Sequence, residues 1–288
     1  MCPLDLLQLT ALLARTSGLR EVGIGLIDGP VLLTHPDLAS ENICVIPGTL
    51  RGTCARAGSL ACMHGTFVAG MLSGRRGSAP LAICPDCTLF VRPIFAEGTP
   101  DSGQMPSATP EELAEAIVDC VDSGARVLNL SAGLTRPTSS GERELAQALD
   151  YAASHGLISV AAAGNQGTLA SSAITRHASV IPVVACDLQA RPLIASNLGN
   201  SIGRRGFMAP GAGITSLGTD GKVQTITGTS AAAPFVTGTI ALLWSAFPGS
   251  NANQIRLALT RLGASRRRAI APPLLDAYAA YQAMHSIQ

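Results

Sequence analysis

Aromatic and charged side chains are scarce in this sequence. Of its 288 residues, 3% are aromatic, 14% are charged and 47% are hydrophobic. The formal net charge is +1, so no field of one sign argues for a nucleic-acid partner or for an anionic membrane surface. The abundance of small and apolar residues instead favours a parallel sheet that is covered by helices on both faces.

Long hydrophobic runs and a secretory signal are also missing. No stretch reaches the roughly 18 to 20 continuous apolar residues that span a bilayer. Residues 4–15 form an apolar run with helical spacing, but Asp5 lies at its start and no basic residue precedes it, unlike a signal peptide. We therefore expect residues 1–20 to be a helical segment docked on the rest of the chain, no membrane partner, and a cytoplasmic location.

Three short segments place an acid, a base and a nucleophile in chain order. A serine hydroxyl becomes nucleophilic when an adjacent imidazole takes its proton, and an anion fixes the tautomer of that imidazole. Asp28, His64 and Ser230 fit these three roles, and each lies among small residues that let a side chain project from a tight backbone. The segments are residues 25–29 (GLIDG), 64–70 (HGTFVAG) and 228–234 (GTSAAAP).

A fourth segment, residues 160–165 (VAAAGN), ends on Asn165. Its side-chain amide, together with the backbone N–H of Ser230, could bind a developing oxyanion. These four segments and their order resemble the subtilisin-like serine peptidases. The resemblance implies an α/β fold of three layers, with a mostly parallel central sheet and helices on both faces. It also implies a single catalytic domain over residues 21–288 that acts as a serine endopeptidase without a cofactor.

The resemblance extends to the substrate-binding strand. In the family, a Ser-x-Gly triplet lines the cleft, and the matching residues here are Ser131, Ala132 and Gly133. With Ala163 and Gly164 they would form the walls of the cleft, and a peptide substrate would lie as an added strand. The alternative is that the triplet is a plain end of the sheet.

Residues 166–180 are expected to form an exposed loop. Arg176 and His177 lie in it, and either could favour an acidic or polar substrate residue if it lined the pocket.

The sequence does not predict a metal site. Residues 35–38 (HPDL) match a family motif in which Asp37 can ligate calcium. The partner loop, residues 73–78, offers Arg75 and Arg76 in place of the oxygen ligands that calcium requires.

Eight cysteines are many for a cytosolic enzyme. Cys84 and Cys87 form a C-x-x-C pair, but no second close pair completes a zinc site. Structural thiols, or one or two disulfides among the cysteines between 44 and 87, are favoured. Because Cys62 lies two residues before His64, its oxidation state could alter catalysis.

Within the superfamily, residues 26–31, 77–80, 84–87 and 91–95 resemble the peptidases of cyanobactin and related peptide-maturation pathways. This implies a ribosomally made precursor peptide as partner, cut between leader and core. Macrocyclising members carry a helical cap between the Asp and His segments, for which this chain has no obvious room. We therefore favour hydrolysis; the alternatives are a macrocyclase acting by transpeptidation and a non-catalytic peptide-binding homologue. With only 27 residues before Asp28, too few for a folding propeptide, the enzyme is expected to fold unaided.

Apolar runs and capping signals predict alternating strands and helices, and hence a parallel sheet. The expected strands are residues 22–27, 89–94, 127–130 and 157–163. The expected helices are residues 65–72, opened by His64, then 110–123 with Thr109 as N-cap, 141–155 and 229–246, with closing helical turns at 257–262 and 274–283.

Overall fold

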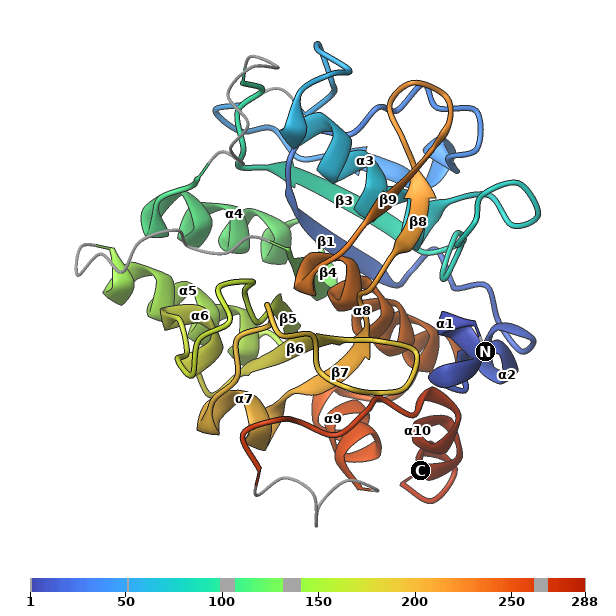
Figure 1. Ribbon diagram of the computed structural model, residues 1–288, viewed down its shortest axis with the longest axis vertical. Coiled ribbons are helices and arrows are strands. Elements are labelled where there is room, and N and C mark those ends of the chain that lie inside the picture. The colour runs from blue at the N-terminus through green and yellow to red at the C-terminus, as the bar shows by residue number, and fades with distance from the viewer. Residues whose placement is uncertain (1, 51, 99–106, 132–140, 262–268, 288) are drawn as a thin grey trace.

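A seven-stranded parallel sheet is the middle layer of the fold (Figure 1). The computed structural model describes residues 2–50, 52–98, 107–131, 141–261 and 269–287. The strand order is β2-β3-β1-β4-β5-β6-β7, and all neighbours run parallel. The strands are β1 (Gly23–Asp28), β2 (Ile43–Val45), β3 (Thr88–Pro93), β4 (Ala125–Leu130), β5 (Ile158–Ala162), β6 (Val180–Cys186) and β7 (Phe207–Pro210). A separate antiparallel pair is formed by β8 (Ile214–Leu217) and β9 (Val223–Ile226).

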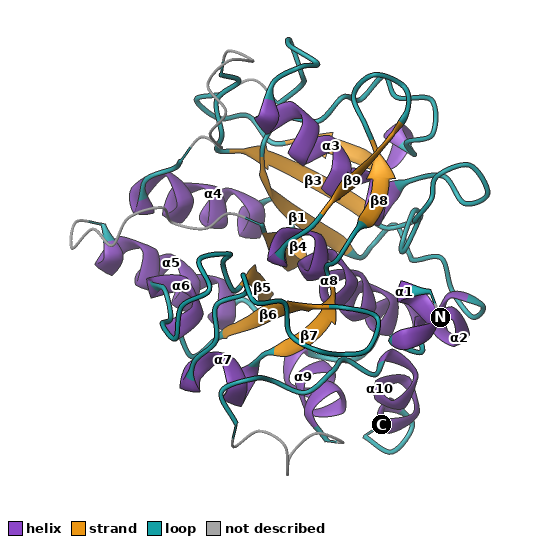
Figure 2. Cartoon of the chain, in the orientation of Figure 1, coloured by secondary structure: helices purple, strands orange, loops and turns teal. Residues whose placement is uncertain are grey.

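Helices cover both faces of the sheet (Figure 2). On one face, Leu26 of β1 packs in the core with α3 (Leu60–Ser73) and α8 (Thr229–Ala246). On the other, Ile27 packs with α4 (Pro110–Asp122) and α5 (Glu142–Ser154). This alternation confirms the predicted α/β fold of three layers, because successive side chains of a strand point to opposite faces. The remaining helices are α1 (Pro3–Leu6), α2 (Leu9–Leu13), η1 (Ser40–Asn42), α6 (Ala173–Arg176), α7 (Asn200–Arg205), α9 (Ala252–Thr260) and α10 (Ala277–Met284).

Two helices show how local sequence sets the elements. In α4, the hydroxyl of Thr109 accepts a hydrogen bond from the N–H of Glu112, whose carboxylate accepts one from the N–H of Thr109. This capping box starts α4 where the sequence predicted. In α8 every residue except Ala246 is buried, as expected for a helix that is apolar on all sides.

The N-terminal segment differs from its prediction. Residues 4–15 form not one helix but two, α1 and α2, with a left-handed turn at Gln8 (φ 53°) between them. The turn lets Leu7, Leu9 and Leu12 all enter the core. The N–H of Ala277 donates to the carbonyl of Leu7 at 2.9 Å, and α2 packs against α10 beside the C-terminus (Figure 1).

Two further expectations about elements were wrong. Helix α3 begins at Leu60, where Ser59 caps it by accepting from the N–H of Cys62, so His64 lies in the second turn and does not open the helix. Residues 166–180 include the short helix α6.

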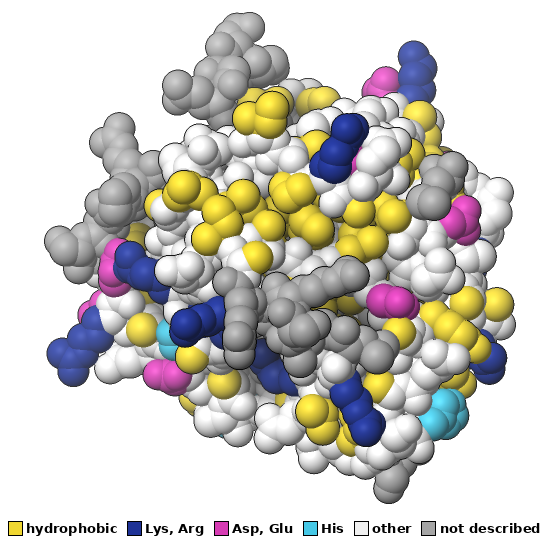
Figure 3. Space-filling model, turned by 60° about the horizontal axis from the view of Figure 1, so that its bottom comes forward, with side chains coloured by type: hydrophobic (Ala, Val, Ile, Leu, Met, Phe, Trp, Pro, Cys, Tyr) yellow, Lys and Arg dark blue, Asp and Glu magenta, His cyan; other side chains and the backbone are white. Residues whose placement is uncertain are grey.

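The surface carries few charges. On the face shown in Figure 3, hydrophobic side chains form a broad band, and the described acidic and basic side chains are scattered. None of the described helices combines the length and the apolar character that crossing a bilayer requires.

Candidate active site

Three adjacent strands end at the edge of the sheet where the predicted residues gather. In the order β1-β4-β5 the strands are parallel, so their carboxyl ends share one edge. Asp28 is the last residue of β1, Ser131 follows β4, and Ala163 follows β5. Open α/β sheets place their ligand sites at this edge.

Asp28 and His64 form a buried pair. The Asp28 side chain is 0% exposed and that of His64 is 11% exposed, and His64 Nδ1 lies 2.7 Å from Asp28 Oδ1. The same oxygen accepts from the N–H of Gly29 at 2.7 Å. Because a carboxylate accepts hydrogen bonds, the proton of neutral His64 sits on Nδ1 and leaves Nε2 as the basic nitrogen.

Glycines let α3 approach the end of β1. A Cβ on Gly65 would lie 2.5 Å from the carbonyl oxygen of Gly29 and 2.6 Å from that of Pro30. A Cβ on Gly29 would lie 2.1 Å from the carbonyl oxygen of Ala61. The glycines that follow Asp28 and His64 in the sequence therefore permit the contact that joins these two side chains.

Ser230 is the second residue of α8, and Asn165 contacts the turn that precedes it. Asn165 Oδ1 accepts from the N–H of Thr229 at 2.9 Å. A Cβ on Gly228 would lie 3.0 Å from Asn165 Nδ2, so the amide rests against the turn. The first N–H groups of a helix have no partner within it, and the helix dipole favours negative charge there. This end of α8 therefore suits a developing oxyanion.

Of the predicted substrate-binding residues, the structure describes Ser131, Ala163 and Gly164. Ser131 is buried, and its Oγ accepts from Asn129 Nδ2 at 2.6 Å. Gly164 has a φ of +100°, and its N–H donates to Thr229 Oγ1 at 3.2 Å. Ala163 is 3% exposed. Ala132 and Gly133 lie outside the described residues.

Sequence comparison assigns the family. The profile of the subtilase family matches residues 20–268. The chain belongs to the subtilase family. This confirms the predicted relationship and the class of enzyme, a subtilisin-like serine endopeptidase.

Curated relatives of this subtilase include the thermophilic serine proteinase of Bacillus sp. (strain AK1), which is 33% identical over 255 residues, 85% of this chain and 57% of the relative. Subtilisin DY of Bacillus licheniformis is 30% identical over 245 residues, 83% of this chain and 82% of the relative. Several other relatives are longer; the chain spans 50% of the thermostable alkaline protease of Halalkalibacterium halodurans.

Solved structures are similar over nearly the whole chain. A mutant of the protease domain of PatA has a TM-score of 0.84 at 27% identity, covering 94% of this chain and 98% of that one. The prenylagaramide maturation protease PagA has a TM-score of 0.82 at 25% identity, covering 96% and 98%. The PatG macrocyclase domain has a TM-score of 0.81 at 20% identity, covering 96% and 95%, a similarity that shows the fold alone.

The environment of His64 in this subtilase shifts its pKa. Burial by itself lowers the pKa, because it disfavours the charged imidazolium. The charge of Asp28 and its hydrogen bond to the ring outweigh burial, and the pKa of His64 is raised above its ordinary value. Asp28 therefore makes His64 a stronger proton acceptor.

Two buried asparagines that the sequence analysis missed organise the site of this subtilase. Asn129 Oδ1 accepts from Thr237 Oγ1 at 2.9 Å, which links β4 to α8. Asn197 Oδ1 accepts from the N–H groups of Gln166 and Thr168, both at 3.1 Å, and so holds the loop after Asn165. Both contacts join segments far apart in sequence, and no local pattern marks either residue.

The loop at residues 73–78, which takes the place of a calcium-binding loop, carries Arg75 and Arg76. Arg75 pairs with Glu41 through two hydrogen bonds of 2.9 and 2.7 Å. Arg76 donates to the carbonyl oxygens of Leu13 and Thr16, both at 3.0 Å, and to those of residues 82 and 83 at 3.4 and 3.3 Å. The guanidinium of Arg76 thus already donates hydrogen bonds to these four carbonyl oxygens.

The structure also shows the surroundings of Arg176 and His177 and the state of the cysteines between 44 and 87. Arg176 lies 3.4 Å from Glu142, and His177 lies 3.4 Å from Asp150, so both face α5. Among the cysteines between 44 and 87, a disulfide joins Cys54 to Cys62, and the other three are free.

Proposed function

We propose that the chain hydrolyses peptide bonds through an acyl-enzyme, with Asp28, His64 and Ser230 as the triad. The observation that carries this proposal is the buried contact of 2.7 Å between Asp28 and His64, which fixes the tautomer that a general base requires. Asn165, held against the turn before Ser230, is the proposed oxyanion donor.

The steps follow from these positions. Ser230 Oγ attacks the carbonyl carbon of the substrate while His64 Nε2 takes the hydroxyl proton. The N–H of Ser230 and Asn165 Nδ2 donate hydrogen bonds to the oxyanion. His64 then gives its proton to the leaving amine, and the acyl group remains on Ser230. Water attacks this ester with His64 again as base, which releases a carboxylic acid and regenerates the serine.

We propose a ribosomally made precursor peptide as substrate, cut between leader and core. Support comes from structures similar to this chain, among them the patellamide maturation protease PatA at 27% identity and the prenylagaramide maturation protease PagA at 25%. Ser131, Ala163 and Gly164 lie just beyond the carboxyl ends of β4 and β5. We propose that the peptide lies there as an added strand, and that Ala132 and Gly133 extend the same binding surface.

Hydrolysis is favoured over transpeptidation. Between Asp28 and His64, the described residues form η1, β2 and the start of α3, with no inserted helical cap among them. A cap would shield the acyl-enzyme from water, so its absence from these residues favours water as the acceptor.

The test is mass spectrometry of a diverse peptide pool, including candidate leader–core peptides, incubated with the enzyme and with its Ser230→Ala variant. Linear fragments that appear only with Ser230 are expected, and their ends give the cleavage preference. Cyclic products would instead identify a macrocyclase. Equal product formation by the Ser230→Ala variant would refute the assignment of the nucleophile.

A further inference from the structure

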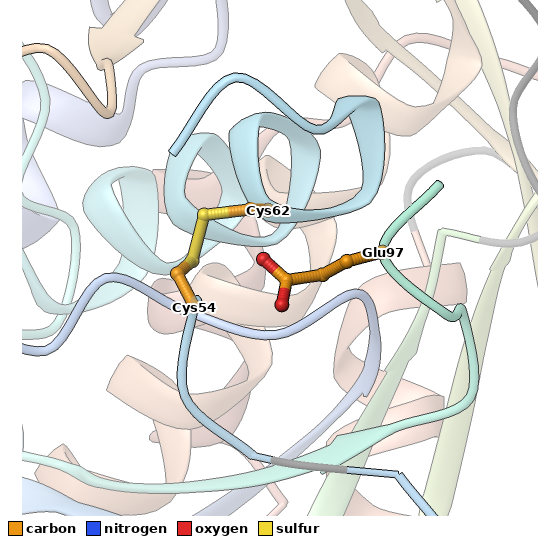
Figure 4. A group of neighbouring side chains, drawn as sticks. All are labelled: Cys54, Cys62 and Glu97. Atoms are coloured by element: carbon orange, nitrogen blue, oxygen red, sulfur yellow. A yellow bond between two sulfur atoms is a disulfide. The ribbon is translucent and has the colours of Figure 1, made fainter. Parts of the chain in front are cut away.

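A disulfide and a carboxylate lie together at the start of α3, the helix that carries His64 (Figure 4). The disulfide joins Cys54, in the preceding loop, to Cys62, the third residue of the helix, with their Cα atoms 5.6 Å apart. The Glu97 carboxylate points toward the two sulfurs. One ligand atom from each of these residues lies within 4.8 Å of the other two. In the part of the chain that the structure describes, no other group of three His, Cys, Asp or Glu side chains is placed to hold a metal ion.

Glu97 is held in this position by backbone donors. Its Oε1 accepts from the N–H of Arg56 at 2.8 Å, and its Oε2 accepts from the N–H of Ala55 at 2.9 Å. Each oxygen of a carboxylate has two lone pairs. Oε2 can therefore keep its bond to Ala55 and still coordinate a cation. In the disulfide form, these two N–H groups therefore hold the carboxylate beside the sulfurs.

We propose that reduction of the disulfide creates a zinc site whose protein ligands are Cys54 Sγ, Cys62 Sγ and the Glu97 carboxylate, with solvent water as the fourth. Thiolate and carboxylate ligands in tetrahedral geometry suit Zn²⁺. Zn–S bonds of about 2.3 Å place two sulfurs roughly 3.8 Å apart, so the pair must separate after reduction. Cys54 lies half-buried in a loop, whereas Cys62 is fully buried on the helix. The loop side can therefore make this adjustment.

The chemistry balances with a dithiol as the reductant. Two electrons and two protons pass from the dithiol to the Cys54–Cys62 bond, giving two thiols and the cyclic disulfide of the reductant. Zn²⁺ then replaces the two thiol protons, which leave to solvent. The Glu97 carboxylate is already an anion and releases no proton. In the reverse reaction, two electrons and two protons pass to the cyclic disulfide of the reductant, which restores the Cys54–Cys62 bond and releases the ion.

The C-x-x-C pair does not offer the same site. Cys84 and Cys87 are both fully buried, and no carboxylate or imidazole of the described residues completes a group of three with them. Two sulfurs without a third protein ligand do not match the four-coordinate sites that zinc prefers.

The experiment uses the full chain carrying Ser230→Ala, so that self-cleavage cannot remove the protein and the result does not depend on peptidase activity. The protein is studied oxidised, and again after reduction by a dithiol that is removed without air. Titration with Zn²⁺ is expected to give one tightly bound ion per reduced chain and none per oxidised chain. Titration of the reduced chain with Co²⁺ is expected to give a sulfur-to-cobalt charge-transfer band.

Variants identify the ligands. Cys54→Ser is expected to abolish stoichiometric binding and the cobalt band. Glu97→Gln should weaken zinc affinity at least about tenfold, as loss of even an outer-shell partner does. Cys44→Ser and Cys84→Ala, at free cysteines outside the group, should bind as the parent does, and circular dichroism checks the folding of each variant. Equal zinc binding by oxidised and reduced protein, binding that survives Cys54→Ser, or no binding by the reduced chain would each overturn the proposal.

Discussion

At the scale of single residues, the side-chain amide of Asn165 has an acceptor role and a proposed donor role, and substitutions can separate the two. Oδ1 accepts from the N–H of Thr229 and orients the side chain, while Nδ2 is the proposed oxyanion donor. Asn165→Ala is expected to lower kcat by about 10²–10³-fold with little change in KM, because the donor acts only in the transition state. Asn165→Asp keeps the acceptor and loses the donor, so it should lower kcat similarly. Steady-state kinetics that show kcat within a few-fold of the parent for both variants would contradict this role.

The raised pKa of His64 predicts the direction of the pH dependence. Only the neutral imidazole can act as base, so kcat/KM should rise with pH through the pKa of the folded enzyme, with a midpoint above about 6.5. Asp28→Asn removes the charge that raises the pKa and should shift the midpoint to lower pH as well as reduce the rate. A pH profile that falls over this range, or a midpoint unchanged by Asp28→Asn, would be inconsistent with the pairing.

The same shift has the opposite consequence for stability. A group whose pKa is raised on folding stabilises the folded state most at pH values below its unfolded pKa. The contribution of the Asp28–His64 pair is therefore lost as pH rises through the folded pKa of His64. The enzyme gains activity in the range where this pair gives up its contribution to stability.

At the scale of elements, the approach of α3 to the end of β1 depends on Gly65. A Cβ there would meet two backbone carbonyl oxygens at 2.5 and 2.6 Å, and backbone cannot give way as a flexible side chain can. Gly65→Ala is expected to cost about 1–3 kcal/mol of unfolding free energy. It should also lower kcat/KM by about a hundredfold, because His64 moves relative to Asp28.

Gly58→Ala is the matched control, since no atom lies within 4 Å of a Cβ built there. Denaturant unfolding in the Ser230→Ala background gives the stabilities, and peptide cleavage by the active enzymes gives the rates. Similar values for the two alanine variants would refute the close-approach argument.

The elements also show which parts of the fold could be predicted. An apolar run predicts β1 to within one residue at each end, Thr109 as N-cap predicts the start of α4, and a long run of small and apolar residues predicts both ends of α8. Strand β6 is not among the predicted strands; Pro182 interrupts its apolar run, and proline is uncommon in a central strand. In the structure, β6 lies between β5 and β7 despite Pro182. Strands β2, β8 and β9 have three or four residues, too few for a clear alternation.

The residues of the candidate site also differ in whether the sequence predicts them. Asp28, His64, Asn165 and Ser230 stand in short sequence motifs, so they could be predicted as site residues from the sequence alone. Asn197 reaches the loop after Asn165 from 31 residues away along the chain, a contact that only the folded arrangement creates. Pairing Cys54 with Cys62 required knowing that α3 begins before His64.

At the scale of the whole molecule, Arg76 ties the N-terminal segment to the loop before β3. Arg76→Met should cost about 1–2 kcal/mol of unfolding free energy, because charged donors to backbone carbonyls are lost. The neighbouring Arg75→Met removes only an exposed ion pair with Glu41 and should cost less than about 1 kcal/mol.

Thermal and denaturant unfolding of both variants, in the Ser230→Ala background with and without a calcium chelator, tests this claim. The difference between the variants should be the same in both conditions, since the cation is part of the chain. A loss in Arg76→Met that calcium restores would show that an ion, and not the guanidinium, is the native partner of these carbonyls.

The position of α8 in the chain also has a consequence for biosynthesis. This helix packs against β4, β5, β6 and β7, all of which precede it in the sequence, and nearly all of it is buried. All seven strands of the sheet are synthesised before Ser230. The acid and the base of the proposed triad are therefore translated before the nucleophile, and a nascent chain that stops short of α8 contains Asp28 and His64 without a serine for them to activate.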